Sequence, residues 1–179
     1  RGKPSMEVIE QLGGSDATER AISLGIDWFT NNQKPNGYWE MGEHNGQSKY
    51  NTAGVGLALL CYYGWGIKHK DATRHARAQN KALEWLLKQQ KEDGDLRGNQ
   101  GGRMYCHGIA AIALCEAYGL TKDPQLRGPA ERAIDFILKA QHTEGGWRYS
   151  PGQKGDLSVS GWQYMAMHSA RMAELTVPD

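Results

Sequence analysis

Gln33-Lys-Pro-Asn-Gly37-Tyr-Trp39 is the first of three stretches of the chain that share one pattern. The second and third stretches read Gln90-Lys-Glu-Asp-Gly94-Asp-Leu96 and Gln141-His-Thr-Glu-Gly145-Gly-Trp147. The three glutamines lie 57 and 51 residues apart. A recurrence at intervals of about 50 residues indicates one structural unit that is built three times.

An amphipathic helix is predicted before each glutamine. The positions seven, five and four residues before it hold an aliphatic residue, an aromatic residue and a bulky apolar residue: Ile26, Trp28 and Phe29, then Leu83, Trp85 and Leu86, then Ile134, Phe136 and Ile137. Spacings of three and four residues align side chains along one stripe of a helix. Residues 16–19 resemble a capping box before the first helix, and Pro129 is expected in the first turn of the third. The glycine after each glutamine is expected to end the helix with a positive φ.

A second helix is predicted in each unit, after the repeated turn. These helices open with small residues, at Ala53, Gly108 and Gly161, and then become apolar on almost every side. Such helices are expected inside, and the first helices, which carry a charged face, are expected outside. The sequence therefore predicts an all-α fold, with three helical hairpins forming part, about half, of an (α/α) ring of outer and inner helices. The units span about residues 17–66, 72–119 and 129–174 of a domain covering 17–179, after an N-terminal tail at 1–16.

Composition excludes several classes of function. The formal net charge of +1 provides no field to attract nucleic acid. No apolar run approaches the roughly 18 residues of a transmembrane helix. Three cysteines at irregular spacing, Cys61, Cys106 and Cys115, do not predict a disulfide framework. The cellular compartment stays open.

The recurring glutamine and tryptophan have a structural interpretation. An indole that covers the turn buries a large apolar plate, which stabilises the fold by about 2 kcal/mol. A glutamine amide at a helix end can bind the main-chain groups that lack a partner there. Together they would fasten each outer helix to its neighbour. Leu96 replaces the tryptophan in the second unit, where weaker fastening is expected.

This pattern resembles the QW motif of the squalene–hopene and oxidosqualene cyclases. Their (α/α) toroid is shared by protein prenyltransferase β-subunits and complement thioester domains. The resemblance covers residues 17–174 and implies three of the roughly six units of a ring. It further implies that the remainder of a longer parent chain, or a second subunit, completes the structure, since an open toroid exposes apolar surface.

The catalytic positions of that family are matched poorly. The cyclase segment Asp-x-Asp-Asp-Thr-Ala corresponds to Asp156-Leu-Ser-Val-Ser-Gly161, so Asp156 is a weak catalytic candidate and Ser158 stands at the acid position. Of the zinc ligands of prenyltransferases, Cys106 has a counterpart, whereas Met104 and Val159 stand where the aspartate and histidine are expected. Cys106 and Asp156 are weak metal candidates, and we predict no cofactor. Whether the chain is an enzyme is left open, with the mismatches favouring a non-catalytic domain.

Binding residues are sought among the side chains near the inner helices. Tyr50, Tyr105, His107 and Trp162 are candidates for lining an apolar groove, although these side chains suit a plain core equally well. The function predicted first is a non-catalytic repeat domain that serves as a scaffold or binds an apolar or isoprenoid ligand, or a partner chain, at its concave face. The alternative is a fragment of a terpenoid cyclase or prenyltransferase whose catalytic residues lie elsewhere.

Overall fold

The computed structural model describes residues 5–98 and 101–178, and in these ranges it contains helices and no strand. This confirms the predicted all-α class. The α-helices are α1 (Met6–Gln11), α2 (Asp16–Asn32), α3 (Asn51–Gly64), α4 (Arg74–Gln89), α5 (Met104–Thr121), α6 (Pro124–Ala140) and α7 (Leu157–Met172); two 3-10 helices are η1 (Met41–His44) and η2 (Ser48–Tyr50). None of the described helices is long and apolar enough to cross a membrane.

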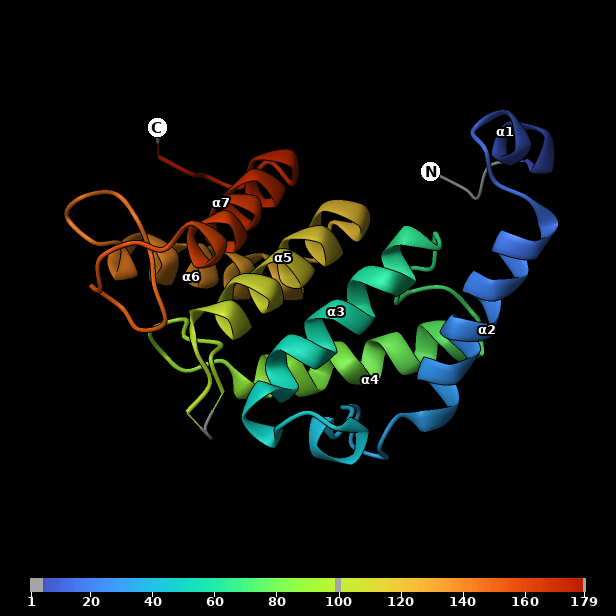
Figure 1. Ribbon diagram of the computed structural model, residues 1–179, viewed down its shortest axis with the longest axis horizontal. Helices are drawn as coiled ribbons and strands as arrows, with labels where there is room; N and C mark the ends of the chain where they lie inside the picture. Colours follow the sequence, from blue (N-terminus) through green and yellow to red (C-terminus); the bar gives the residue numbers. More distant parts are fainter. Residues whose placement is uncertain (1–4, 99–100, 179) are drawn as a thin grey trace.

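The helices form two layers (Figure 1). α3, α5 and α7 lie side by side, with α5 in contact with both neighbours. α4 and α6 lie behind them, and α2 stands at one end of the array. The predicted inner helices therefore correspond to α3, α5 and α7, and the predicted outer helices correspond to α2, α4 and α6.

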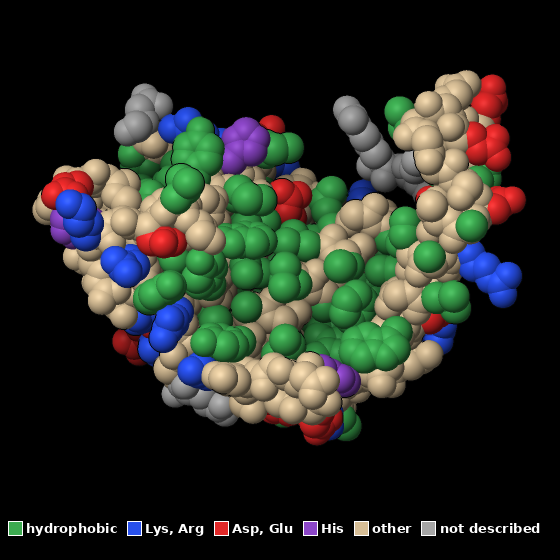
Figure 2. Space-filling view, viewed as in Figure 1, with side chains coloured by type: hydrophobic (Ala, Val, Ile, Leu, Met, Phe, Trp, Pro, Cys, Tyr) green, Lys and Arg blue, Asp and Glu red, His purple; other side chains and the backbone are tan. Residues whose placement is uncertain are grey.

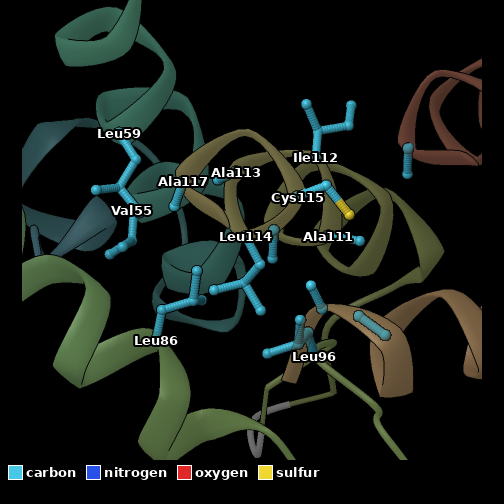
Figure 3. Close-up of a cluster of buried hydrophobic side chains, with 14 of the residues drawn as sticks. Val55, Leu59, Leu86, Leu96, Ala111, Ile112, Ala113, Leu114, Cys115 and Ala117 are labelled. Carbon is cyan, nitrogen blue, oxygen red and sulfur yellow. The ribbon is translucent and has the colours of Figure 1, made fainter. Parts of the chain in front are cut away.

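The core lies between the two layers. Figure 3 shows Val55 and Leu59 of α3, Leu86 of α4 and Leu114 of α5 converging with Leu96 from the second turn. All five side chains are fully buried. Burial of a leucine-sized side chain stabilises a fold by roughly 1.5–3 kcal/mol, so this cluster binds the layers together.

A small residue allows α3 and α5 to approach closely. A Cβ atom added at Gly56 would lie 3.0 Å from the main-chain oxygen of Ile109, a contact that side chains seldom make. Gly56 thus has a packing role between α3 and α5.

Two helix starts differ from the sequence prediction. α2 is capped by Ser15, whose side chain accepts a hydrogen bond from the Thr18 N–H while the Thr18 hydroxyl accepts one from the Ser15 N–H. This box begins one residue before the predicted one. α6 begins at Pro124 after the cap Asp123, so Pro129 lies inside the helix and the predicted start there is wrong. α1 also lies within the segment that was expected to be a tail.

The repeated turns share one geometry. The glycines Gly37, Gly94 and Gly145 have φ values of 101°, 92° and 94°, so their predicted positive φ is confirmed. They do not end the helices as predicted, because α2, α4 and α6 already end at Asn32, Gln89 and Ala140, before the glutamines. In each turn the glutamine Nε2 donates a hydrogen bond to the main-chain oxygen of the glycine, at 3.0, 3.4 and 2.8 Å for Gln33, Gln90 and Gln141 respectively. The glutamine amide therefore closes the loop that its own glycine opens.

The two tryptophans of the repeat are buried beneath the ends of the outer helices. Trp39 Nε1 donates to the main-chain oxygen of Phe29 at 2.9 Å, and Trp147 Nε1 donates to that of Ile137 at 2.7 Å. Each acceptor is four residues before the glutamine, in the last turn of an outer helix, where carbonyl groups lack helical partners.

Candidate ligand-binding face

Large apolar side chains are exposed on the inner helices. Leu57 of α3 is 44% exposed, Leu120 of α5 is 37% exposed, and Met165 and Met172 of α7 are 52% and 68% exposed. Figure 2 shows apolar side chains gathered in the middle of the face that α3, α5 and α7 present in Figure 1. We call these four side chains, together with Ile112 of α5, the inner face.

The sequence builds this face by repeating one register. Leu57, Ile112 and Met165 each stand four residues after the small residue that opens their helix. Residues at this spacing recur on the same side of a helix, so three parallel helices place them in one row. Ile112 in the middle of the row is 4% exposed, because its neighbours flank it on both sides. The row is therefore exposed at both ends and covered at its centre.

Polar groups are present one turn further along the inner helices. Glu116 of α5 accepts a hydrogen bond of 2.8 Å from the Ser169 hydroxyl of α7. Cys61 of α3, at the matching position, is exposed, and partial burial raises the pKa of its thiol. This end of the inner face can thus contact a polar group, while the row of Leu57, Ile112 and Met165 offers hydrocarbon.

The predicted aromatic residues lie near the beginnings of the inner helices. Tyr50 precedes α3 and is half-buried, with the Lys49 ammonium 5.1 Å from its ring centre. The Tyr105 hydroxyl donates to the Ser158 hydroxyl oxygen at 2.8 Å, linking α5 to α7. Trp162 packs half-buried against the core. Two of these residues, Tyr105 and Trp162, thus have identified structural contacts that do not depend on a ligand.

His107 is fully buried and fastens the second turn. Its Nδ1 accepts a hydrogen bond of 3.0 Å from the Leu96 N–H, and its Nε2 lies 2.9 Å from the main-chain oxygen of Ala133. A carbonyl oxygen can only accept, so Nε2 carries the proton and the ring is neutral. Burial lowers the pKa of His107 to about 4. Neither ring nitrogen is left for a ligand, so we do not include His107 in the inner face.

His107 gives the second unit, which lacks the tryptophan, a bond to the next outer helix. Leu96 replaces the indole and is fully buried. At the position of His107, the third unit has Ser160, whose hydroxyl accepts a hydrogen bond of 3.0 Å from the main-chain N–H of Trp147. The same position thus holds the turn in both units, and the imidazole also reaches the next outer helix.

The second turn is further held by ion pairs. Asp95 is 1% exposed and accepts hydrogen bonds from Arg97 at 3.0 Å and from Lys91 at 2.9 Å. Burial alone would favour the neutral acid, but these bonds hold the pKa of Asp95 at about 2. The carboxylate therefore stays charged and structural at neutral pH.

The weak catalytic and metal candidates have other partners. Asp156 caps α7 by accepting a hydrogen bond of 2.9 Å from the Val159 N–H. Cys106 is buried, its Sγ lies 3.9 Å from the Lys49 oxygen, and burial raises the pKa of the thiol. In the part of the chain that the structure describes, no group of three or more histidine, cysteine, aspartate or glutamate residues is placed to hold a metal ion.

Sequence reasoning emphasised aromatic side chains and missed the aliphatic and thioether residues of the inner face. The signal was present in the register of Leu57, Ile112 and Met165, but an apolar residue in an apolar helix looks like core. Glu116 was also missed. A charged residue in an otherwise apolar helix marks a side that is not fully buried, and this could have identified the face.

The chain is similar in sequence to a drimenyl diphosphate synthase from Streptomyces showdoensis. The two are 27% identical over 139 residues, which are 75% of this chain and 24% of that protein. The chain thus spans about a quarter of the length of this relative. No family model matches the chain, and no solved structure matches it significantly. The similarity supports a terpenoid cyclase-like relationship.

Proposed function

We propose that this chain is a terpenoid cyclase-like repeat domain that binds an apolar, isoprenoid-type chain along its inner face without catalysing its conversion. The observation that carries the proposal is the exposure of Leu57, Met165 and Met172 on parallel helices. Apolar patches that adjoin on a protein surface are characteristic of binding sites. The similarity to a drimenyl diphosphate synthase supports an isoprenoid as the ligand class.

The free energy gained by covering the exposed side chains of the inner face is sufficient for binding. Covering a side chain that is half exposed contributes on the order of 1 kcal/mol, so the exposed members of the inner face contribute a few kcal/mol together. The loss of ligand freedom opposes this gain. An affinity in the micromolar to millimolar range is therefore reasonable for an apolar chain of moderate length.

The absence of catalysis in this proposal rests on the roles of two residues. Asp156 is engaged as a helix cap, and Ser158, at the acid position of the family resemblance, accepts a hydrogen bond from Tyr105. An alcohol is far too weak an acid to protonate an alkene at neutral pH. The chain would therefore provide a wall for the ligand and leave proton transfer to other residues.

A second candidate function is a segment of a terpenoid cyclase or prenyltransferase whose catalytic residues lie elsewhere. The observation that favours it is the extent of the similarity, which covers most of this chain and only 24% of the synthase. In that case the inner face would form one wall of a substrate cavity. The two functions share the binding surface and differ in whether the complete protein turns over its ligand.

Binding can be tested by calorimetric titration of the 179-residue chain with farnesol. We expect saturable binding that Met165→Glu weakens by at least about tenfold, because a carboxylate in the row must be desolvated. Leu12→Glu is the matched control, since Leu12 is 80% exposed outside the inner face. Equal affinities of all three proteins, or no binding at all, would overturn the proposal. Incubation of the chain with farnesyl diphosphate and Mg²⁺, followed by product analysis, tests the non-catalytic role, since product formation would contradict it.

A further inference from the structure

The third repeated turn leaves open a contact that the first two turns make. Gln33 Nε2 donates a second hydrogen bond to the main-chain oxygen of Ala78 in α4, at 2.8 Å. Gln90 Nε2 donates similarly to Pro129 in α6, at 2.9 Å. Among the residues that the structure describes, Gln141 bonds within its own turn and reaches no further outer helix. The third glutamine therefore retains a donor for another helix.

The glycines of the three turns also differ in whether the next outer helix packs against them. A Cβ added at Gly37 or Gly94 would collide with the main-chain oxygen of Lys81 or Arg132 in the following outer helix. A Cβ added at Gly145 would meet nothing within 4 Å. Gly37 and Gly94 are buried, and Gly145 is exposed. Each of the first two turns thus holds a helix backbone directly against its glycine, and the third turn presents the same geometry to solvent.

The neighbouring inner helix has matching open positions. Tyr164 of α7 is 68% exposed, whereas its counterpart Ala111 in α5 is fully buried. Met167 is half-buried, whereas its counterpart Leu114 is fully buried. Tyr164, Met167 and Gln141 line a surface hollow of about 230 Å³. We call this set, with Gly145, the C-terminal end face.

α2 exposes the complementary side at the opposite end of the array (Figure 1). By its distance from the repeated glutamine, Ala21 corresponds to the acceptors Ala78 and Pro129. Ile22 and Gly25 are in register with buried positions of α4 and α6, and Trp28 is in register with the partly buried Trp85 and the buried Phe136. Ile22 is 46% exposed and Trp28 is 44% exposed. We call these four residues of α2 the N-terminal end face.

Gly25 shows the difference most clearly. Its counterparts Ala82 and Ala133 are fully buried. Gly25 is exposed, and a Cβ added there would meet no atom within 4 Å. α2 therefore has the small residue that allows close helix approach, and nothing in the described chain covers it.

We propose that the C-terminal end face binds the N-terminal end face of a second copy of this chain. In this contact Gln141 Nε2 donates to the main-chain oxygen of Ala21 of the second copy, and Gly145 meets the backbone near Leu24. The choice of a second copy rests on register, because both halves of a joint that the chain makes twice internally are present on one molecule. The association is head to tail, since two different surfaces meet.

The proposal can be tested by sedimentation velocity over a range of concentrations of the 179-residue chain. We expect reversible association that Gly25→Glu weakens by at least about tenfold, since the carboxylate would be buried in the contact. Ser23→Glu is the matched control, because its counterpart in α6 is Glu131, which is tolerated on the half-exposed side of that helix. Circular dichroism checks folding of both variants.

Mixing two variants tests the head-to-tail arrangement. Gly25→Glu blocks one end face and Tyr164→Glu blocks the other, so each variant alone should remain monomeric while the mixture forms a one-to-one heterodimer. A mixture that stays monomeric would contradict the arrangement. A wild-type chain that remains monomeric up to about 1 mM would overturn the proposal entirely, as would association that is equally strong in Gly25→Glu and Ser23→Glu.

Discussion

The Gln90 side-chain amide donates a hydrogen bond of 2.9 Å to the main-chain oxygen of Pro129, 39 residues further along the chain. Gln33 makes the equivalent bond to Ala78 across 45 residues. A side chain that ends one outer helix thus fixes the position of the next. The repeated turn therefore joins successive units as well as closing a loop.

Replacing the repeated glutamines should separate these two roles. Gln33→Ala and Gln90→Ala each remove the bond to the next outer helix and leave its carbonyl oxygen without that donor, so we expect each to lower the free energy of unfolding by about 1–3 kcal/mol. Gln141→Ala removes a bond within an exposed turn and should cost about 1 kcal/mol or less. Urea denaturation of dilute protein measures the differences. Equal losses at all three positions would show that the bond between helices contributes little.

Substituting the glycines provides an independent comparison. Alanine at Gly37, Gly94 or Gly145 must adopt a positive φ, which costs about 1–2 kcal/mol at each position. Gly37→Ala and Gly94→Ala also force the next outer helix away, because the new Cβ would collide with its backbone. We expect these two variants to lose at least about 2 kcal/mol more than Gly145→Ala. Thermal unfolding in dilute solution checks the order, and a ranking with Gly145→Ala lowest in stability would refute it.

Trp147→Phe should test the indole bond. The substitution keeps most of the buried aromatic surface but removes the indole Nε1, which lies 2.7 Å from the Ile137 main-chain oxygen, and so leaves that oxygen without its donor. We expect a loss of about 1–2 kcal/mol in the free energy of unfolding. Trp28→Phe is a suitable control, since Trp28 is 44% exposed and should lose less than half as much. Guanidinium denaturation followed by circular dichroism avoids the change in tryptophan fluorescence.

His107 should make the fold sensitive to mild acid. Its folded pKa of about 4 lies below the ordinary value of 6.5 because of burial, so the unfolded chain binds the proton more readily. The contribution of His107 is therefore fully present above pH 6.5 and is lost as the pH falls towards 4, by about 3 kcal/mol in total. Asp95, with its pKa held at about 2, loses its own contribution only below its ordinary value of 3.8.

His107→Gln isolates this effect. The glutamine amide supplies one acceptor and one donor but has no proton to gain, so the stability of the variant should depend less on pH between 6.5 and 4. Denaturant midpoints measured at several pH values provide the comparison. A variant with the same pH dependence as the wild type would show that another group is responsible.

The all-α class and the positive-φ glycines were predictable because they follow from local signals: the spacing of apolar residues and a motif that recurs three times. The start of α6 was not predicted correctly, because Pro129 was taken as the start signal. The actual cap is Asp123 and the first helical residue is Pro124. The contacts of His107 were also hidden. Its partners Leu96 and Ala133 lie on other segments, so only the folded structure brings them to the ring.

The candidate site was predictable in position more than in composition. The inner helices were identified from their small, apolar beginnings. Which side of each helix remains exposed depends on how its neighbours pack, and α5 is covered on both sides while α3 and α7 are not. Leu57 and Met165 therefore looked like core in the sequence, and the bond between Tyr105 and Ser158 could not be foreseen because the two residues lie on different helices.

The most direct test of the proposed function is photoaffinity labelling of the chain with a benzophenone-bearing farnesyl analogue, followed by mass spectrometry of the labelled peptides. The account predicts cross-links in the peptides that contain Leu57 and Met165, reduced by an excess of unlabelled farnesol. Labelling confined to the outer helices α2, α4 and α6, or labelling that farnesol does not reduce, would contradict it.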